Sequence, residues 1–218
     1  MTTNPALLVI DMQNGFCSSR GSFARSGASI GAYGAIIPEV GELCAAARSA
    51  GVQVIYTRHV YRAGYLDAGI DMEHVHPRVI AERGLVNGEW DAEIVRELAP
   101  HEQDVVIEKK RYDSFLWTDL DLILRRLRVE HLTFAGVSTN VCVESTARTA
   151  AQLGYKVFVT IDATAATSRE LHESAIRSLQ YGFGMTGAWR EIAATWDRSA
   201  VELPLNPEGV MPTDVVED

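Results

Sequence analysis

Short runs rich in valine and isoleucine alternate along this chain with longer segments whose apolar residues recur every three or four positions. The short runs are predicted as strands and lie at 6–12, 52–59, 104–110, 131–137 and 156–163. The longer segments are predicted as helices and lie at 36–51, 117–129, 143–154 and 168–180. Such alternation is typical of parallel sheets that carry helices on both faces. The sequence therefore predicts an α/β protein with three αβα layers and a mostly parallel central sheet.

The length of the chain is that of one α/β domain. Its 218 residues are 47% hydrophobic, enough for one substantial core. We expect a single domain over 1–218, in which about 196–218 form an acidic, proline-containing tail that packs on a neighbouring subunit. The glycine-rich segments 17–34 and 60–88 are predicted to be irregular loops that cover a substrate or contact another subunit.

Charge and cysteine content narrow the possible partners and location. The formal net charge of -9 gives no general attraction to nucleic acid or to an anionic membrane. The first residues lack the basic start of a signal peptide, and no apolar run is long enough to span a membrane. The three cysteines (Cys17, Cys44 and Cys142) show no short paired spacing. We therefore expect a cytoplasmic protein without structural disulfides.

Three chemically complementary residues follow the ends of predicted strands. Asp11 follows the first strand, Lys109 lies at the end of the third, and Cys142 follows the fourth across a short turn. Ligands of open parallel sheets bind beyond the carboxyl ends of the strands. A helix N-terminus and a lysine both favour a thiolate, and an aspartate could carry the thiol proton. Taken singly, Cys142 could be a buried apolar residue, Asp11 a turn cap, and Lys109 part of a solvated charge run with Lys110 and Arg111.

Three segments resemble the signature motifs of the isochorismatase-like cysteine hydrolases, which have a Rossmann-like fold. They are "LLVIDMQNGF", "VVIEKKRYDSF" and "GVSTNVCVEST", and the similarity spans roughly residues 6 to 190. The third motif is especially similar to ureidoacrylate amidohydrolases and related ureido- or carbamoyl-amide hydrolases. The resemblance implies that Asp11, Lys109 and Cys142 form a catalytic triad, with Lys109 rather than Lys110 as its lysine.

The resemblance also implies how the triad works. Cys142 attacks an amide or ureide carbonyl, Asp11 shuttles the proton, and Lys109 stabilises the thiolate. A cis peptide at Val137–Ser138 and the backbone N–H groups of Ser138 and Cys142 are expected to form an oxyanion hole. No cofactor is needed for this chemistry.

The resemblance makes a metal site improbable. Nicotinamidases of this superfamily carry an Asp-x-His metal motif after the second strand, where this chain has Thr57 and His59. His74 and His76 lack a third ligand in the sequence and are interpreted as loop residues. We therefore expect no metal.

Further residues near the triad are candidates for substrate binding. They are Gln13, Phe16, His59, Arg111, Tyr112, Phe115 and Trp117. Five arginines could each anchor a substrate carboxylate, and the sequence does not rank them: Arg20, Arg25, Arg58, Arg62 and Arg111.

The leading functional hypothesis is a cysteine-dependent hydrolase of the C–N bond in a small amide, ureido or carbamoyl compound. The alternatives are an isochorismatase-type vinyl ether hydrolase or a nicotinamidase, and, outside enzymes, a catalytically silent binding homologue. The expected partner is a small molecule, and the resemblance implies a homodimer or homotetramer.

Overall fold

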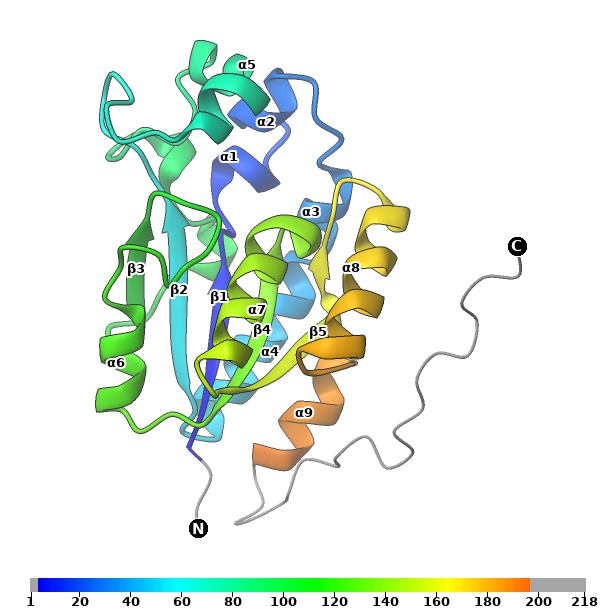
Figure 1. Cartoon of the computed structure of the whole chain (residues 1–218). Coiled ribbons are helices and arrows are strands. Elements are labelled where there is room, and N and C mark those ends of the chain that lie inside the picture. The colour runs from blue at the N-terminus through cyan, green and yellow to red at the C-terminus, as the bar shows by residue number, and fades with distance from the viewer. Residues whose placement is uncertain (1–3, 197–218) are drawn as a thin grey trace.

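A six-stranded, all-parallel sheet forms the centre of the computed structural model, which describes residues 4–196 (Figure 1). Its strand order is β3-β2-β1-β4-β5-β6, so the chain winds outward in both directions from β1. The strands are β1 (Pro5–Ile10), β2 (Gln53–His59), β3 (Val105–Lys109), β4 (His131–Val137), β5 (Lys156–Ala165) and β6 (Met185–Gly187). The predicted fold class and the first five strands are confirmed. The sequence did not predict β6, which is three residues long and too short to show a periodic pattern.

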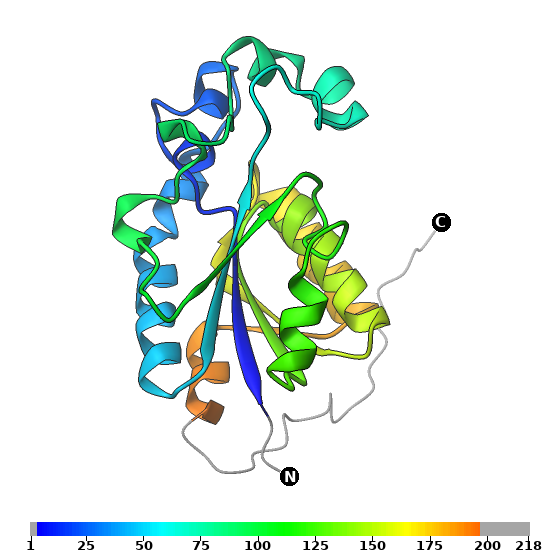
Figure 2. The same cartoon turned by 90° about the vertical axis from the view of Figure 1, so that its left-hand side faces the viewer.

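Helices cover both faces of the sheet. One layer holds α4 (Ile37–Ser49) and α9 (Trp189–Trp196), and the other holds α6 (Leu120–Arg126), α7 (Glu144–Gln152) and α8 (Arg169–Gly182). Figure 2 shows the sheet nearly edge-on between the layers.

The central strand β1 is apolar throughout because it is buried on both faces. Leu7 and Val9 pack in the core under α4 and α9, whereas Ala6, Leu8 and Ile10 pack under α6, α7 and α8. Successive side chains of a strand point to opposite faces, so two separate cores need an unbroken apolar run.

Local signals explain where the predicted helices begin and end. Gly51 follows α4 with φ +72°, and Gly154 follows α7 with φ +94°, a conformation that glycine adopts readily. The hydroxyl of Ser168 accepts a hydrogen bond of 3.2 Å from the N–H of Leu171 and so caps α8. The helix expected from 117 begins only at Leu120, since Trp117 has φ +59°, which a helix cannot contain. Helix α9 was not predicted from the sequence.

The prediction that 17–34 and 60–88 are irregular is wrong in part. They contain several helices of four or five residues: α2 (Ser22–Arg25), α3 (Gly31–Ala35), the π-helical turn η1 (Asp71–Val75) and α5 (Pro77–Ala81). Helices this short show no periodicity, and tertiary contacts hold them instead. The buried carboxylate of Asp91 accepts hydrogen bonds from the N–H and hydroxyl of Ser22 and from the N–H of Leu85. With α1 (Asn14–Cys17), these helices lie beyond the carboxyl ends of the strands (Figure 1).

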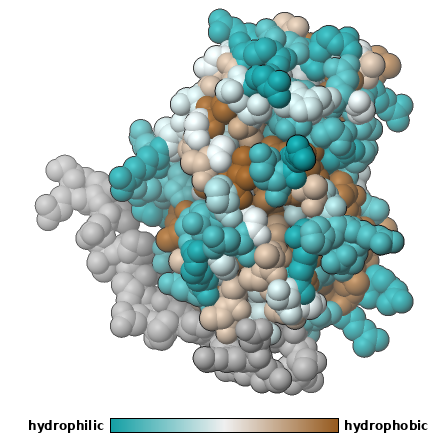
Figure 3. Space-filling model, turned by 180° about the vertical axis from the view of Figure 1, so that it is seen from behind, coloured by the Kyte–Doolittle hydropathy of each residue, from teal (hydrophilic) through white to brown (hydrophobic). Residues whose placement is uncertain are grey.

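The surface of the protein carries both hydrophilic and hydrophobic residues. From behind, hydrophilic residues dominate the end that carries the short helices, and hydrophobic residues show in separate groups below it (Figure 3). Within residues 4–196, no helix has the length and apolar character needed to cross a membrane. The expected tail, apart from Trp196 at the end of α9, lies outside the described residues.

Candidate active site

The structure brings Asp11, Lys109 and Cys142 together at the carboxyl ends of the strands. Asp11 directly follows β1, Lys109 is the last residue of β3, and Cys142 lies in the π-helical turn η4 (Thr139–Val143) after β4. The ammonium nitrogen of Lys109 lies 2.7 Å from Oδ2 of Asp11 and 3.5 Å from Sγ of Cys142. All three side chains are buried. The sequence prediction that these residues meet therefore agrees with the geometry.

The backbone and its neighbour on β2 hold the carboxylate of Asp11 in place. Asp11 has φ +52°, a left-handed conformation that is uncommon outside glycine and turns its side chain away from the line of β1. The hydroxyl of Thr57 donates a hydrogen bond of 2.6 Å to Oδ1 and accepts one of 3.2 Å from the Asp11 N–H. Oδ2 lies 2.7 Å from the Lys109 ammonium and accepts no other hydrogen bond from the described residues. One carboxylate oxygen is thus bonded to Thr57, and the other is ion-paired with Lys109.

Lys109 is a buried cation fixed by backbone carbonyl groups. Its ammonium donates hydrogen bonds to the carbonyl oxygens of Arg111 at 3.0 Å and Tyr112 at 3.2 Å. Burial acts to lower the pKa of Lys109, but the adjacent Asp11 and Cys142 outweigh it, and the pKa is raised above its ordinary value. Lys109 and Asp11 therefore form a buried ion pair.

Burial has the largest effect on the Cys142 thiol. It raises the pKa of the thiol far above its ordinary value, Lys109 acts to lower that pKa, and the charge of Asp11 raises it further. The sequence led us to expect a thiolate favoured by the helix N-terminus and the lysine. Burial of the thiol acts against that expectation, and so does the charge of Asp11, whereas Lys109 acts in its favour. The thiol thus lies beside both a carboxylate that can accept its proton and an ammonium that can stabilise the thiolate.

The turn that carries Cys142 has an unusual backbone. The peptide bond Val137–Ser138 is cis, as the resemblance implied. The hydroxyl of Ser138 donates a hydrogen bond of 2.8 Å to the side-chain oxygen of Asn140, and Thr139 bonds Nδ1 of His172 at 2.8 Å. The first contact holds the turn internally, and the second ties it to α8. The oxyanion hole formed by the N–H groups of Ser138 and Cys142 stays a prediction.

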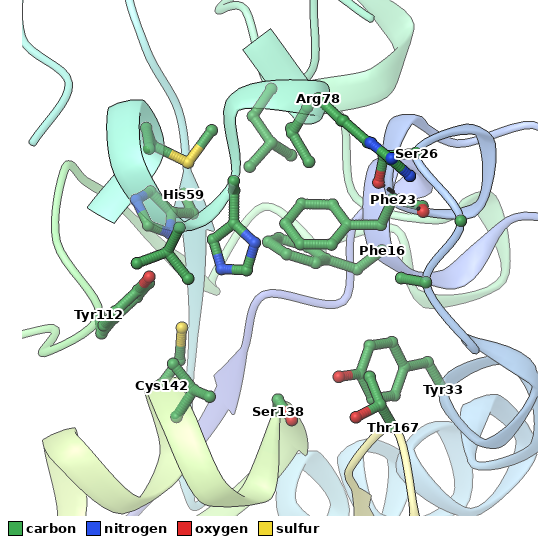
Figure 4. A pocket seen from close by; sticks show the side chains of 18 of the residues that line it. Phe16, Phe23, Ser26, Tyr33, His59, Arg78, Tyr112, Ser138, Cys142 and Thr167 are labelled. Carbon is green, nitrogen blue, oxygen red and sulfur yellow. Dashed lines mark hydrogen bonds between the residues drawn. The ribbon is translucent and has the colours of Figure 1, made fainter. Parts of the chain in front are cut away.

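A cavity of about 440 Å³ lies over Cys142. Figure 4 shows Cys142 and Ser138 on one side of it and aromatic rings across from them. Its lining is mainly apolar, with polar groups near the thiol, as in sites for small organic molecules. The apolar and aromatic lining includes Phe16, Phe23, Tyr33, Met72, Val75, Val79, Leu85, Tyr112 and Val141, and the polar lining includes Ser26, His59, His76, Arg78, Ser138, Asn140 and Thr167.

Three of the seven predicted substrate-binding residues line this cavity: Phe16, His59 and Tyr112. Gln13 does not. Its fully buried amide donates to the carbonyl oxygens of His59 and Ala92 and accepts from the His59 N–H, so it joins the end of β2 to the segment after β1.

The other three predicted residues lie elsewhere. Arg111 donates a hydrogen bond of 3.0 Å to the carbonyl oxygen of Asp67 and lies over the ring of Trp117, which is 76% exposed. Phe115 packs in the core below α6 and stacks on Tyr155. Nothing in the sequence distinguishes these aromatic residues from Tyr112, which does face the cavity.

Several lining residues were not singled out from the sequence. Phe23, Tyr33, Met72 and Arg78 come from the two long segments that were predicted to cover a substrate. The sequence thus indicated the right segments. It could not indicate the residues, because tertiary contacts between short helices decide which side chains point inward.

His59 is the last residue of β2 and pairs in register with Lys109. Its Nε2 lies 2.6 Å from the hydroxyl of Tyr61. Burial and the charge of Lys109 hold the pKa of His59 well below its usual value. The imidazole is therefore neutral and can exchange hydrogen bonds with a ligand at physiological pH.

One group of side chains within the described residues has the spacing of metal ligands. The ligand atoms of Asp11, His59 and Cys142 lie within 4.8 Å of one another. The ammonium of Lys109 already lies against two of these ligands, and its charge opposes a second cation there. His74 and His76 belong to no such group in residues 4–196. The expectation of a metal-free site stays a prediction.

Known proteins resemble this chain in sequence and in fold. The model of the isochorismatase domain family matches residues 5–191. The chain is 32% identical to ureidoacrylate amidohydrolase RutB of Pseudomonas syringae pv. syringae, over 88% of this chain and 83% of that protein. It is 35% identical to the RutB protein of Pantoea ananatis, over 82% of this chain and 76% of that protein.

Solved structures agree with the sequence comparison. A cysteine hydrolase from Pseudomonas syringae pv. phaseolicola superposes with a TM-score of 0.82 at 30% identity, covering 89% of this chain and 92% of that one. An isochorismatase family protein from Desulfovibrio vulgaris superposes with a TM-score of 0.80 at 31% identity, covering 90% of this chain and 100% of that one. The family match spans most of the chain, including all three motifs that carry Asp11, Lys109 and Cys142. This chain belongs to the isochorismatase family.

Proposed function

We propose that the protein is a cysteine-dependent hydrolase that cleaves the C–N bond of a small ureido, carbamoyl or amide compound through a thioester. The observation that carries this proposal is the contact of Asp11, Lys109 and Cys142 below a cavity large enough for a small organic substrate. A vinyl ether hydrolase needs no nucleophile of this kind, whereas cleavage of an amide benefits from one. The relatives named as ureidoacrylate amidohydrolases support the same reaction class.

In the first half of the reaction, Cys142 becomes an acyl carrier. Its thiol proton passes to Oδ2 of Asp11 as Sγ attacks the carbonyl carbon of the substrate. The N–H groups of Ser138 and Cys142 stabilise the resulting oxyanion, and one such donor contributes about 2.7–4 kcal/mol in acyl transfer. Asp11 then gives the proton to the leaving nitrogen, the C–N bond breaks, and ammonia or an amine departs.

In the second half, water releases the acyl group. Asp11 takes a proton from a water molecule that attacks the thioester, the C–S bond breaks, and the thiolate recovers a proton from Asp11. Lys109 stays protonated throughout and stabilises the negative charge wherever it resides, on the carboxylate or on sulfur. An acid or a carbamate leaves the site. A carbamate then decomposes to carbon dioxide and to ammonia, or to an amine where its nitrogen carries a substituent.

The test is ammonia release from ureidoacrylate, N-carbamoylsarcosine, biuret, maleamate and nicotinamide. We expect release from at least one ureido or carbamoyl compound, and we expect Cys142→Ala to abolish it. The matched control is Cys44→Ala, which removes a buried thiol in α4 and should keep the activity. Full activity of Cys142→Ala would overturn the proposal.

Two other outcomes identify the alternatives. Release of pyruvate from isochorismate would indicate a vinyl ether hydrolase, and release confined to nicotinamide together with a bound metal would indicate a nicotinamidase. Binding of these compounds without turnover would indicate a silent homologue.

Location and assembly form part of the proposal. We assign the protein to the cytoplasm, in keeping with its free cysteines, and expect a homodimer or homotetramer. Exposed apolar side chains such as Leu66, Ile70 and Leu122 support self-association. Light scattering coupled to size-exclusion chromatography tests the assembly.

A further inference from the structure

The cavity over Cys142 is large for a short ureido acid. Its volume of about 440 Å³ equals that of about 15 water molecules, at roughly 30 Å³ each. It falls in the lower half of the range of about 300–1,000 Å³ that is typical of pockets for drug-sized molecules. A ureido group with a three-carbon chain would leave much of it to water.

Aromatic rings form the side of the cavity that faces Cys142. The ring centroids of Phe16 and Phe23 lie 4.4 Å apart, and those of Phe23 and His76 lie 5.6 Å apart (Figure 4). Burial lowers the pKa of His76, so this ring adds little charge to the group at neutral pH. Met72 and Leu85 extend the apolar surface. Water beside such a surface is displaced favourably by an apolar body, with about 25 cal/mol gained per Å² removed from water.

Among the residues that the structure describes, Arg78 is the one lysine or arginine that lines the cavity. Figure 4 shows its guanidinium beside Ser26, beyond the phenylalanine rings as seen from Cys142. Arg78 is exposed and lies within 4.0 Å of no carboxylate of the described residues. A guanidinium in this position can bind a ligand carboxylate through two parallel hydrogen bonds.

The arginines singled out in the sequence are engaged elsewhere and do not line the cavity. Arg25 pairs with Glu82, Arg58 with Glu93 and Glu108, and Arg62 with Asp67, whereas Arg20 lies over Trp90 and Arg111 over Trp117. The structure therefore ranks Arg78 above all of them as an anchor for a substrate anion.

We infer that the substrate is a ureide or amide of an acid in which an aromatic-sized apolar body separates the scissile carbonyl from a carboxylate. The carbonyl lies at Cys142, the apolar body packs on Phe16 and Phe23, and the carboxylate pairs with Arg78. This inference rests on the proposed function and specifies its substrate class. The short ureido acid that gives the relatives their name is then a poor substrate for this chain.

The test compares three ureides: 4-(ureidomethyl)benzoate, its neutral counterpart 4-methylbenzylurea, and ureidoacrylate. We expect the aromatic acid to give the highest kcat/KM. Arg78→Gln should lower kcat/KM for the aromatic acid by about tenfold or more, mainly through KM, and should affect the neutral compound much less. Phe23→Ala should lower kcat/KM for both aromatic compounds more than for ureidoacrylate. The control is Arg62→Gln, which removes an arginine of the same segment that does not line the cavity.

A higher kcat/KM for ureidoacrylate than for the aromatic acid would overturn the inference while keeping the proposed function. An equal effect of Arg78→Gln on the acid and the neutral compound would overturn the role of Arg78. A binding measurement keeps the two proposals separate. Calorimetry should detect binding of 4-ethylbenzoate, which has no scissile bond. Arg78→Gln should weaken this binding. Absence of binding would contradict the inference even in a protein that hydrolyses ureides. Binding without hydrolysis of any ureide would contradict the proposed function and leave only the assignment of the aromatic and carboxylate contacts.

Discussion

The ammonium nitrogen of Lys109 lies 2.7 Å from Oδ2 of Asp11, and neither side chain has any exposed surface. The attraction between the two charges offsets the cost of removing each of them from water. The carbonyl groups of Arg111 and Tyr112 accept further hydrogen bonds from the ammonium. The pair is neutral overall. It therefore places the Asp11 carboxylate, a proton acceptor, beside the buried Cys142 thiol without adding a net positive charge that would favour the thiolate.

Removing the cation should destabilise the protein as well as inactivate it. Lys109→Met leaves the Asp11 carboxylate buried without its partner, and breaking a buried pair in this way costs about 3–5 kcal/mol. Urea unfolding measures the loss. The control is Lys110→Met, whose partly exposed ammonium lies 3.8 Å from Asp67 and which should lose less than about 1 kcal/mol. In the double variant Asp11→Asn, Lys109→Met, the loss should be smaller than the sum of the two single losses, and an additive result would show that the pair is not coupled.

Asp11→Asn should abolish turnover and yet make Cys142 more reactive towards iodoacetamide. The charge of Asp11 raises the pKa of the thiol, so its removal leaves Lys109 free to favour the thiolate. A fall of one pKa unit corresponds to about tenfold more thiolate at a pH below the pKa. Peptide mass spectrometry at pH 8 follows alkylation at Cys142 alone.

The wild-type protein provides the pH reference for that experiment. Because burial raises the pKa of its thiol, alkylation should continue to accelerate with increasing pH and should show no plateau near neutrality. Thr57→Val removes the hydrogen bond to Asp11 but keeps the charge of the carboxylate. The rate at which its Cys142 is alkylated should therefore lie closer to the wild-type rate than that of Asp11→Asn does. Slower alkylation of Asp11→Asn would contradict the predicted direction.

The sequence predicted the sheet and the meeting of Asp11, Lys109 and Cys142 because both depend on signals carried by neighbouring residues. The run from Ala6 to Ile10 is apolar because it is buried on both faces of the sheet. The polar residue that follows it must therefore lie at the carboxyl end of the strand. Most of the cavity lining could not be predicted in this way. Phe23 and Arg78 reach the cavity from helices of four and five residues, whose positions depend on contacts such as those of Asp91. The state of the Cys142 thiol also depends on burial, which the local sequence does not report.

Replacing His59 should make the free energy of unfolding depend less steeply on pH below neutrality. The pKa of His59 is well below its usual value of 6.5 in the folded protein, so the unfolded chain binds a proton that the folded one does not. The stability due to the neutral imidazole is complete above about pH 6.5 and falls as the pH drops below it, by up to about 1.4 kcal/mol per pH unit. His59→Asn should reduce this slope in urea titrations between pH 7.5 and 5.

The control is His101→Asn, which makes the same substitution at an exposed histidine. Burial also lowers the pKa of His76, His131 and His172, so part of the slope should remain in His59→Asn. A slope that is unchanged in His59→Asn would show that His59 takes up its proton equally well in the folded and unfolded states.

Gly136 lies in β4, just before the turn that carries Cys142, and its substitution should affect both the sheet and that turn. It has φ +107°, and a Cβ atom there would lie 2.1 Å from the carbonyl oxygen of Ile10, the residue before Asp11. Gly154 has a similar φ of +94° but no atom within 4 Å of such a Cβ, so Gly154→Ala measures the backbone cost alone, about 1–2 kcal/mol. Gly136→Ala should lose clearly more stability in thermal unfolding and, where it folds, should lose ammonia release because Asp11 is displaced. Equal losses of stability in the two variants would mean that β1 and β4 can separate at this point without cost, and the close contact between the strands would then have no part in positioning Asp11.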